Sequence, residues 1–229
     1  MEFKNLSYLL IVLVTIGFTA AFSFGKNVRF YSKLKYLLPA FIFTGTIFII
    51  WNIRFVELSI WNFNPEFITG KQLFKLPLEE VLFLFAITYF SVLIYETVKV
   101  KFFNFWKPNV FLILSLFLLI IFGFLAFFSR DKLYTFFTFF LLSIYFAYTI
   151  FRNRFKVHFS RFYLTYIFAV IPFISLKLIL IYLPALSYDI AHILGIRILN
   201  VPVEDFGYFF LLLLMNVTIY EYLTERQFY

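Results

Sequence analysis

Seven long apolar stretches follow one another along this sequence of 229 residues, and only short polar gaps separate them. A helix that crosses a membrane needs ~20 apolar residues, and each stretch approaches that length. The expected spans are 6–24, 34–52, 76–96, 109–128, 132–151, 162–184 and 201–221. Only 14% of the residues are charged, against ~25% in a soluble domain. We therefore expect an all-α, multi-pass membrane protein with seven transmembrane helices.

The distribution of positive charge predicts how the chain is oriented. We interpret the first stretch as a span rather than a cleaved signal peptide, because Glu2 beside Lys4 makes its N-terminal region weakly basic. One side of the membrane would carry seven Lys and Arg residues and the other twelve, with Lys177 inside a span. Since cytoplasmic loops are enriched in these residues, we expect the N-terminus outside and the C-terminus cytoplasmic in a cell membrane. The net charge of +8 then favours contact with anionic lipid headgroups over nucleic acid.

Several kinds of site are excluded by what the sequence lacks. It has no Cys, which excludes disulfides and thiolate metal sites. Its two histidines, His158 and His192, stand apart from one another, so no His-rich metal cluster is expected. The seven Gly residues form none of the Gly-rich patterns that bind nucleotides, flavins or nicotinamides. We therefore expect neither a metal nor a cofactor.

A shift of 125 residues brings two copies of one polar pattern into register. The pattern G-x6-P-x-E-[ED]-x14-Y-E runs from Gly70 to Glu96 and again from Gly195 to Glu221. The same shift places spans five, six and seven on spans one, two and three. The expected units are a three-helix repeat in 1–104, a linking helix in 105–130 and a second repeat in 131–229, which together form one compact domain. Because the fourth helix restores the chain direction, this 3+1+3 arrangement makes the repeats parallel, with both motifs on the same side of the membrane.

The motif places adjacent acids at the start of spans three and seven: Glu79 with Glu80, and Glu204 with Asp205. Acids at a helix N-terminus often only cap free N–H groups and complement the helix dipole. Their pairing in both repeats and their place at the edge of apolar spans favour a functional site. In a dry site, burial and crowding of like charges favour one protonated carboxyl beside others that are anionic. Such a set is suited to donate and remove a proton.

Three further side chains are candidates for the wall of this site. Phe83 and Tyr208 lie three and four residues after the acids and so share their helix face, where a ring would stabilise a positive intermediate. Core packing is the alternative in a chain so rich in Phe. Lys177 would either pair with an acid of the second motif or extend its ammonium to the surface. Glu96 and Glu221 lie ~25 Å further along the helices and are expected near the opposite interface.

The segments LPLEEVLF (76–83) and VPVEDFGYFF (201–210) resemble the paired PxE[ED] motifs of integral-membrane lycopene cyclases. The resemblance covers nearly the whole chain, which is similar to the form in which the two small subunits of some bacterial members are fused. One departure is that the first copy has Phe83 where the second has Tyr208. The resemblance implies a membrane enzyme that acts on lycopene, a polyene dissolved in the lipid, without net redox change.

By this resemblance, the reaction closes rings at the ends of lycopene. An acid protonates the terminal double bond, a neighbouring double bond attacks the carbocation, and a base removes a proton. We expect the four motif carboxyls to form the acid/base set, and Phe83, Tyr208 and Lys177 to line the substrate. Because the family includes cyclases that form β, γ or ε rings, the product stays open, with β-type rings as our expectation. The number of ends cyclised and the oligomeric state are also left open.

Proteins of other classes are the alternatives. The main one is a small 3+1+3 membrane transporter of the sugar-transporter type, but its Pro-Gln signature is absent because Leu78 follows Pro77 and Val203 follows Pro202. A retinal photoreceptor would carry its lysine in the last helix, whereas Lys177 is in span six. A prenyltransferase would need paired Asp clusters that bind magnesium diphosphate, and this chain has only three Asp residues.

Overall fold

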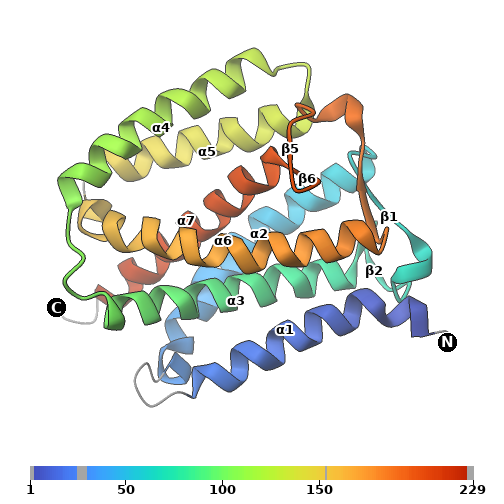
Figure 1. Ribbon diagram of the computed structural model, residues 1–229, viewed down its shortest axis with the longest axis horizontal. Helices are drawn as coiled ribbons and strands as arrows, with labels where there is room; N and C mark the ends of the chain where they lie inside the picture. The colour runs from blue at the N-terminus through green and yellow to red at the C-terminus, as the bar shows by residue number, and fades with distance from the viewer. Residues whose placement is uncertain (1–2, 25–29, 153, 226–229) are drawn as a thin grey trace.

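The computed structural model describes residues 3–24, 30–152 and 154–225, and it confirms an all-α, multi-pass architecture (Figure 1). Each of the seven long helices is apolar enough to cross a membrane. They are α1 (Ser7–Ser23), α2 (Leu34–Glu57), α3 (Leu78–Lys101), α4 (Pro108–Phe128), α5 (Leu133–Phe151), α6 (Phe159–Tyr182) and α7 (Val203–Glu225). Three basic residues that contributed to the expected orientation lie outside the described residues: Lys26, Arg29 and Arg226.

The two motif helices are the most buried of the seven, and α4 is the least buried. α7 packs against α2, α3, α5 and α6, while α3 also packs against α1, α2 and α6. Figure 1 shows α4 beside α5 at one edge of the bundle and α1 beside α3 at the opposite edge. The motif helices are therefore the ones most removed from the surrounding lipid.

The same arrangement of short strands precedes the last helix of each repeat. In the first repeat it consists of β1 (Trp61–Phe63), β2 (Gln72–Leu73) and β3 (Leu76–Pro77), and in the second of β4 (Leu186–Tyr188), β5 (Arg197–Ile198) and β6 (Val201–Pro202). β2 with β3 and β5 with β6 form two antiparallel hairpins. Because the hairpin strand β3 takes up residues 76 and 77, α3 begins two residues later than the expected span. It then continues past residue 96 to Lys101.

Strands β1 and β4 pair with each other and join the two repeats. The pairing is antiparallel, with Asn62 opposite Ser187, and the shift of 125 residues makes these the same position in their repeats. Antiparallel strands that meet at equivalent residues are related by a two-fold axis between them. The repeats are therefore parallel, as expected, and related by a pseudo-two-fold axis. The flanking backbone hydrogen bonds obey the same symmetry: Asn64 N to Ala185 O, and Asp189 N to Ile60 O.

Candidate active site

A hairpin positions the start of each motif helix. Leu78 N donates to Lys71 O at 2.9 Å, and the equivalent Val203 N donates to Ile196 O at 3.0 Å. The turn before each hairpin holds the motif glycine at positive φ, 79° in the first repeat and 87° in the second. L side chains rarely adopt this backbone region. The hairpins therefore place both acid pairs in the first turn of their helices, at equivalent depth.

The first acid of each motif binds the loop that precedes its helix. Glu79 Oε1 accepts the Thr69 N–H at 2.7 Å, and Glu204 Oε1 accepts the Leu194 N–H at 2.6 Å. Glu204 Oε1 also accepts the hydroxyl of Thr135 in α5 at 2.5 Å. Both carboxyls are buried. Their backbone partners lie ten residues earlier in the chain, so these acids secure a loop rather than cap their own helix.

The second acid of each motif is held by tyrosine hydroxyls. Glu80 accepts a hydrogen bond from Tyr8 at the start of α1. Asp205 Oδ1 accepts one from Tyr134 at the start of α5, and its Oδ2 accepts one from Tyr188 in β4 at 2.5 Å. Glu80 is 2% exposed and Asp205 0%. The hydroxyls therefore stabilise these carboxyls in place of water.

Tyr188 links the two motifs. It lies in β4, outside the spans, and burial raises the pKa of its hydroxyl well above the usual 10.0. The carboxylate of Asp205 raises this pKa further, and so does that of Glu80. Tyr188 therefore stays a neutral donor near physiological pH. Lys177 Nζ lies 3.9 Å from Asp205 Oδ2 and over the ring of Phe83, which in turn lies beside Tyr8, the partner of Glu80. The two acid pairs therefore belong to one polar cluster, which we call the acid cluster (Glu79, Glu80, Glu204 and Asp205).

Phe83 and Tyr208 both lie in the buried interior beside the acid cluster. The Phe83 ring centroid is 6.3 Å from that of Tyr8, which binds Glu80. The Tyr208 ring is 5.7 Å from that of Trp61, and its hydroxyl donates to an amide oxygen of α2 at 3.0 Å. These contacts are consistent with both interpretations of the two rings, as a wall around the acids and as part of the packed core.

Lys177 pairs with an acid of the second motif and does not extend to the surface. Its side chain is 1% exposed, and its Nζ lies 3.9 Å from Asp205 Oδ2. The ammonium also lies over the ring of Trp61 at 4.9 Å and over that of Phe83 at 5.4 Å. Lys177 is thus a buried counter-ion inside the aromatic surroundings of the cluster.

Sequence reasoning missed the tyrosines that bind the second acids. A signal existed for two of them, because Tyr8 and Tyr134 both lie near the start of the first helix of their repeat. No such signal marks Tyr188, whose counterpart under the shift is Phe63. Trp61 was missed as well, because only the pairing of β1 with β4 brings the second repeat to it.

A second polar cluster lies at the opposite end of α3 and α7. Glu96 and Glu221, which were expected near that interface, are both buried. Lys99 Nζ lies 2.7 Å from Glu221 Oε1 and 3.3 Å from Glu96 Oε1. Lys33 also pairs with Glu96, and the Tyr220 hydroxyl donates to Glu96 at 2.9 Å. Because these contacts join α3 to α7, they favour a structural role for the two acids.

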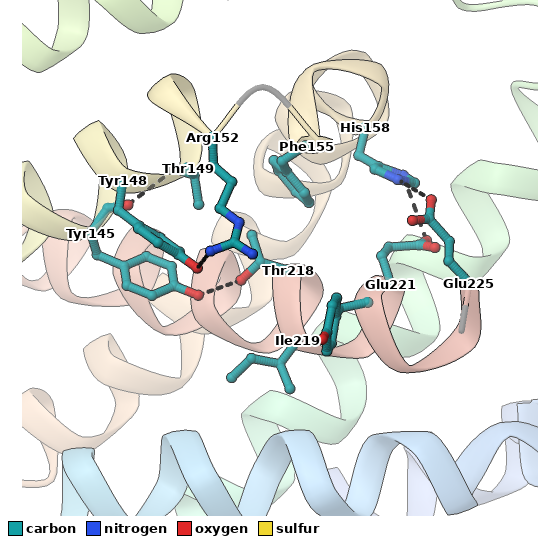
Figure 2. Close-up of a pocket in the computed structure, with 11 residues that line it drawn as sticks. Tyr145, Tyr148, Thr149, Arg152, Phe155, His158, Thr218, Ile219, Glu221 and Glu225 are labelled. Atoms are coloured by element: carbon teal, nitrogen blue, oxygen red, sulfur yellow. Dashed lines mark hydrogen bonds and ion pairs between the residues drawn. The ribbon is translucent and has the colours of Figure 1, made fainter. Parts of the chain in front are cut away.

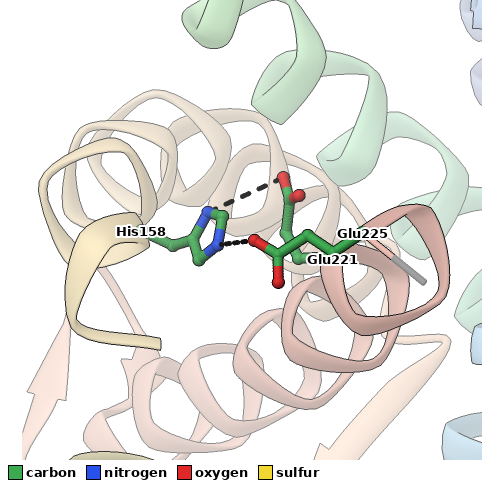
Figure 3. Close-up of side chains that lie close together, drawn as sticks. All are labelled: His158, Glu221 and Glu225. Carbon is green, nitrogen blue, oxygen red and sulfur yellow. Dashed lines mark hydrogen bonds and ion pairs between the residues drawn. The ribbon is translucent and has the colours of Figure 1, made fainter. Parts of the chain in front are cut away.

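A pocket of about 460 Å³ opens beside this second cluster, between α5, α7 and the turn before α6 (Figure 2). His158, isolated in the sequence, lies there with Nε2 2.9 Å from Glu225 Oε1 and Nδ1 3.9 Å from Glu221 Oε1 (Figure 3). The potential ligand atoms of these three residues lie within 4.8 Å of one another. However, the ammonium of Lys99 already neutralises Glu221. A metal ion would have to displace it, which disfavours a metal centre here.

A smaller pocket of about 240 Å³ reaches the acid cluster from the side of α1. Glu79 lines it together with Thr69, the loop residue that it binds. The other lining residues are Leu6, Leu9, Leu78 and Lys71, so most of them are apolar.

Comparison with protein families matches both repeats. The model of a family described as lycopene cyclase matches residues 5–98 and 131–223. Each matched segment contains one P-x-E-[ED] helix start, and α4 lies between the two segments. No match is found among curated proteins or among solved structures.

Proposed function

The chain belongs to the lycopene cyclase family, and we propose that it closes β-type rings at the ends of lycopene in carotenoid biosynthesis, without net redox change. A lycopene cyclase role follows from the family. The ring type and the acid/base chemistry are our proposal. The substrate is a polyene dissolved in lipid, which accords with a chain whose seven long helices are all apolar enough to cross a membrane.

The proposed reaction needs one carboxylic acid and one carboxylate. The acid donates a proton to a terminal double bond, and the resulting carbocation is attacked by a neighbouring double bond, which closes the ring. The carboxylate then removes a proton and leaves a double bond in the ring. One proton enters and one leaves for each ring, so the product is an isomer of the substrate. General acid–base catalysis of this kind contributes about 10²–10⁴-fold to a rate.

Glu80 and Asp205 are the carboxyls that we assign to proton transfer. Both are buried and held by hydroxyl groups, which stabilise a carboxyl in either protonation state. Glu79 and Glu204 are assigned as positioning residues, because each holds a backbone N–H of the preceding loop. Phe83, Tyr208 and Lys177 are assigned to the wall of the site.

The observation that supports this proposal is the burial of two equivalent acid pairs in an aromatic interior. Proton transfer to a hydrocarbon forms a carbocation, which water would capture, and charges interact more strongly where water is excluded. Aromatic rings stabilise a nearby cation through their electron-rich faces. The acid cluster combines both features, with Phe83 and Tyr208 beside it.

We further propose that lycopene reaches the cluster from the lipid along the apolar pocket beside α1, which Glu79 lines. The acid cluster would lie towards the outer face of a cell membrane, and the second polar cluster towards the cytoplasm, following the excess of Lys and Arg on that side.

Carotenoid profiling of a lycopene-accumulating bacterial strain that expresses this chain tests the function. We expect cyclic carotenoids with the mass of lycopene, and comparison of retention times with β-, γ- and ε-ring standards identifies the ring. Glu80→Gln and Asp205→Asn are each expected to lower conversion by about 100-fold or more. Glu66→Gln, an exposed acid in the same loop region, is the matched control and should convert normally.

Unchanged conversion in both Glu80→Gln and Asp205→Asn would remove the chemical basis of the proposal. Uptake of a water-soluble solute by proteoliposomes, with no carotenoid turnover, would support the transporter instead.

A further inference from the structure

The two halves of the acid cluster differ in charge at one pair of equivalent positions. Under the shift of 125 residues, Asp205 corresponds to Glu80, and Lys177 of α6 corresponds to Asn52 of α2. Lys177 Nζ lies 3.9 Å from Asp205 Oδ2, and both side chains are 1% exposed. Within residues 3–24, 30–152 and 154–225, Glu80 forms no ion pair, and the side chain that corresponds to Lys177 is a neutral amide. The pseudo-symmetry of the backbone is therefore broken by one buried ammonium.

Asp205 is surrounded by groups that favour its ionised form. Tyr134 and Tyr188 donate to its two oxygens, one each, and the ammonium of Lys177 supplies an opposite charge. An ionised carboxylate only accepts hydrogen bonds, so a shell made of donors and a cation matches the anion. In the part of the chain that is described, Lys177 Nζ has no hydrogen-bond partner of its own. Asp205 is therefore its counter-charge.

Glu80 has the opposite kind of surroundings. It is 2% exposed and accepts a hydrogen bond from Tyr8, and Asn52, which accepts from the Tyr208 hydroxyl at 3.0 Å, stands in place of a cation. Burial without an opposing charge favours the protonated form of a carboxyl. The hydroxyl of Tyr8 binds Oε2 of Glu80, and a neutral hydroxyl can bind a protonated carboxyl as well as an ionised one.

Building on the proposed cyclase function, we propose that Glu80 donates the proton and Asp205 removes it, in one asymmetric site shared by both repeats. Lys177 is the positioning residue that keeps Asp205 ionised. As the O–H bond of Glu80 breaks, a C–H bond forms at the terminal double bond, and the electrons of the next double bond form the ring C–C bond. Asp205 then takes a proton from carbon, and the electrons of that C–H bond become the ring double bond. Asp205 then loses its proton to solvent and Glu80 takes one from solvent, which completes the cycle.

The carbocation is expected to develop away from the ammonium of Lys177. An ammonium repels a nearby carbocation, and this repulsion is strong where water is excluded. The rings of Trp61 and Phe83, over which the ammonium of Lys177 already lies, are therefore less suited to the positive intermediate. Tyr208, which binds Asn52, is the ring that we assign to the intermediate.

Deuterium labelling separates the proton donor from the proton acceptor. The full-length protein is reconstituted in vesicles that contain lycopene, in D₂O, and both product and recovered lycopene are analysed by mass. Wild type should place one deuterium in each ring. Glu80→Gln should place none in product or lycopene. Asp205→Asn should form product about 100-fold more slowly, yet deuterium should enter recovered lycopene, because protonation still occurs and reverses. Deuterium in lycopene with Glu80→Gln, or none with Asp205→Asn, would overturn the assignment.

Variants of Lys177 test its positioning role. The charged and titratable groups that face Asp205 are Tyr134 of α5, Tyr188 of β4, Lys177 of α6 and Tyr208 of α7, with Arg197 of β5 acting on Tyr188. Lys177→Met should move the rising limb of the pH profile of kcat to higher pH by about one unit or more, with KM little changed. Lys177→Arg keeps the positive charge, so its rising limb should lie at the same pH as that of wild type. An unmoved limb in Lys177→Met would contradict the role.

The results also distinguish this inference from the function on which it depends. A wild-type protein that folds in vesicles and leaves lycopene unchanged would contradict the cyclase function itself. An active wild type with reversed labelling in the two variants would leave the function standing and contradict only the assignment of acid and base.

Discussion

Hydroxyl groups are the principal partners of the buried motif carboxyls. Tyr8 donates to Glu80, Tyr134 donates to Asp205, and Thr135 donates to Glu204. A buried carboxyl without such partners would strongly destabilise the folded protein. Hydroxyl groups relieve this cost without adding a full charge. In the described part of the chain, the bundle therefore holds several acids close together with Lys177 as the one buried ammonium beside them. The donors come from helices other than the motif helices, so each contact also fixes helix packing.

The contact between Thr135 and Glu204 predicts that Thr135 contributes more to the free energy of unfolding than Thr138, which lies three residues later in α5. Thr135→Val removes a hydroxyl that donates to Glu204 at 2.5 Å and should lower the free energy of unfolding by about 1.5–3 kcal/mol. Thr138→Val is the matched control, because the buried Thr138 hydroxyl has no hydrogen-bond partner among the described residues. Its removal should be neutral or slightly stabilising. Denaturant titration in mixed micelles measures both, and equal effects would contradict the prediction.

The raised pKa of Tyr188 predicts how stability depends on pH. Its pKa in the folded protein lies above the ~10 of an unfolded chain. The stability that Tyr188 contributes is therefore complete below pH ~10 and is lost as the pH rises towards the folded value, by up to about 1.4 kcal/mol per pH unit. Tyr188→Phe lacks this contribution, so its stability should fall less steeply than that of wild type above pH ~10. Thermal unfolding in detergent measures the slopes.

Tyr31 is exposed, so Tyr31→Phe is the control for removing a tyrosine hydroxyl that is not buried. Its stability should fall with pH as steeply as that of wild type. Identical slopes for wild type and Tyr188→Phe would show that Tyr188 does not act on stability in this way.

At the scale of elements, close packing between α5 and α7 positions the second motif. Gly207 follows Asp205 by two residues, and a Cβ at this position would lie 3.0 Å from the Phe139 ring and 3.1 Å from Thr138 Cγ2. The absence of a side chain therefore lets α7 approach α5 closely enough for Tyr134 to reach Asp205.

This close approach makes Gly207→Ala a test of helix packing. The added methyl group should destabilise the protein by about 1–3 kcal/mol through overpacking and should lower cyclase activity by displacing α7. Gly123→Ala in α4 is the control, because nothing lies within 4 Å of a Cβ there, and Ala is favoured over Gly within a helix by about 0.5–1 kcal/mol. Unfolding in mixed micelles together with carotenoid profiling measures both effects. A Gly207→Ala protein as stable as Gly123→Ala would contradict this account.

At the scale of the whole molecule, the two repeats are related by the pseudo-two-fold axis, and this arrangement brings the acid pair of one repeat into the same cluster as that of the other. The pairing of β1 with β4 sets the axis, and the linking helix α4 lets both repeats enter the membrane in the same direction. Each repeat alone would hold its acids in a half-site. Together they bury the acids of α3 and α7 in the interior of the bundle.

The expected orientation can be tested because the chain has no native Cys. Ile190→Cys lies in the loop region beside the acid cluster and Phe103→Cys after the end of α3, and both positions are well exposed. If the N-terminus is outside, a membrane-impermeant thiol reagent should label Ile190→Cys in intact cells and Phe103→Cys only after lysis. The reverse pattern would invert the proposed orientation. Labelling of both after lysis is the control for accessibility.

The length and apolarity of the helices, the repeat and the position of the four acids were all evident in the sequence, because they depend on local composition and on spacing along the chain. The binding partners of the acids were not. Tyr8 and Glu80 are 72 residues apart, and Tyr134 and Asp205 are 71 apart. Such contacts depend on how α1 and α5 pack against the motif helices. The ion pair of Lys177 with Asp205, rather than with Glu204, was likewise decided only when α6 packed beside the cluster, because only the packing sets which carboxyl an ammonium can reach.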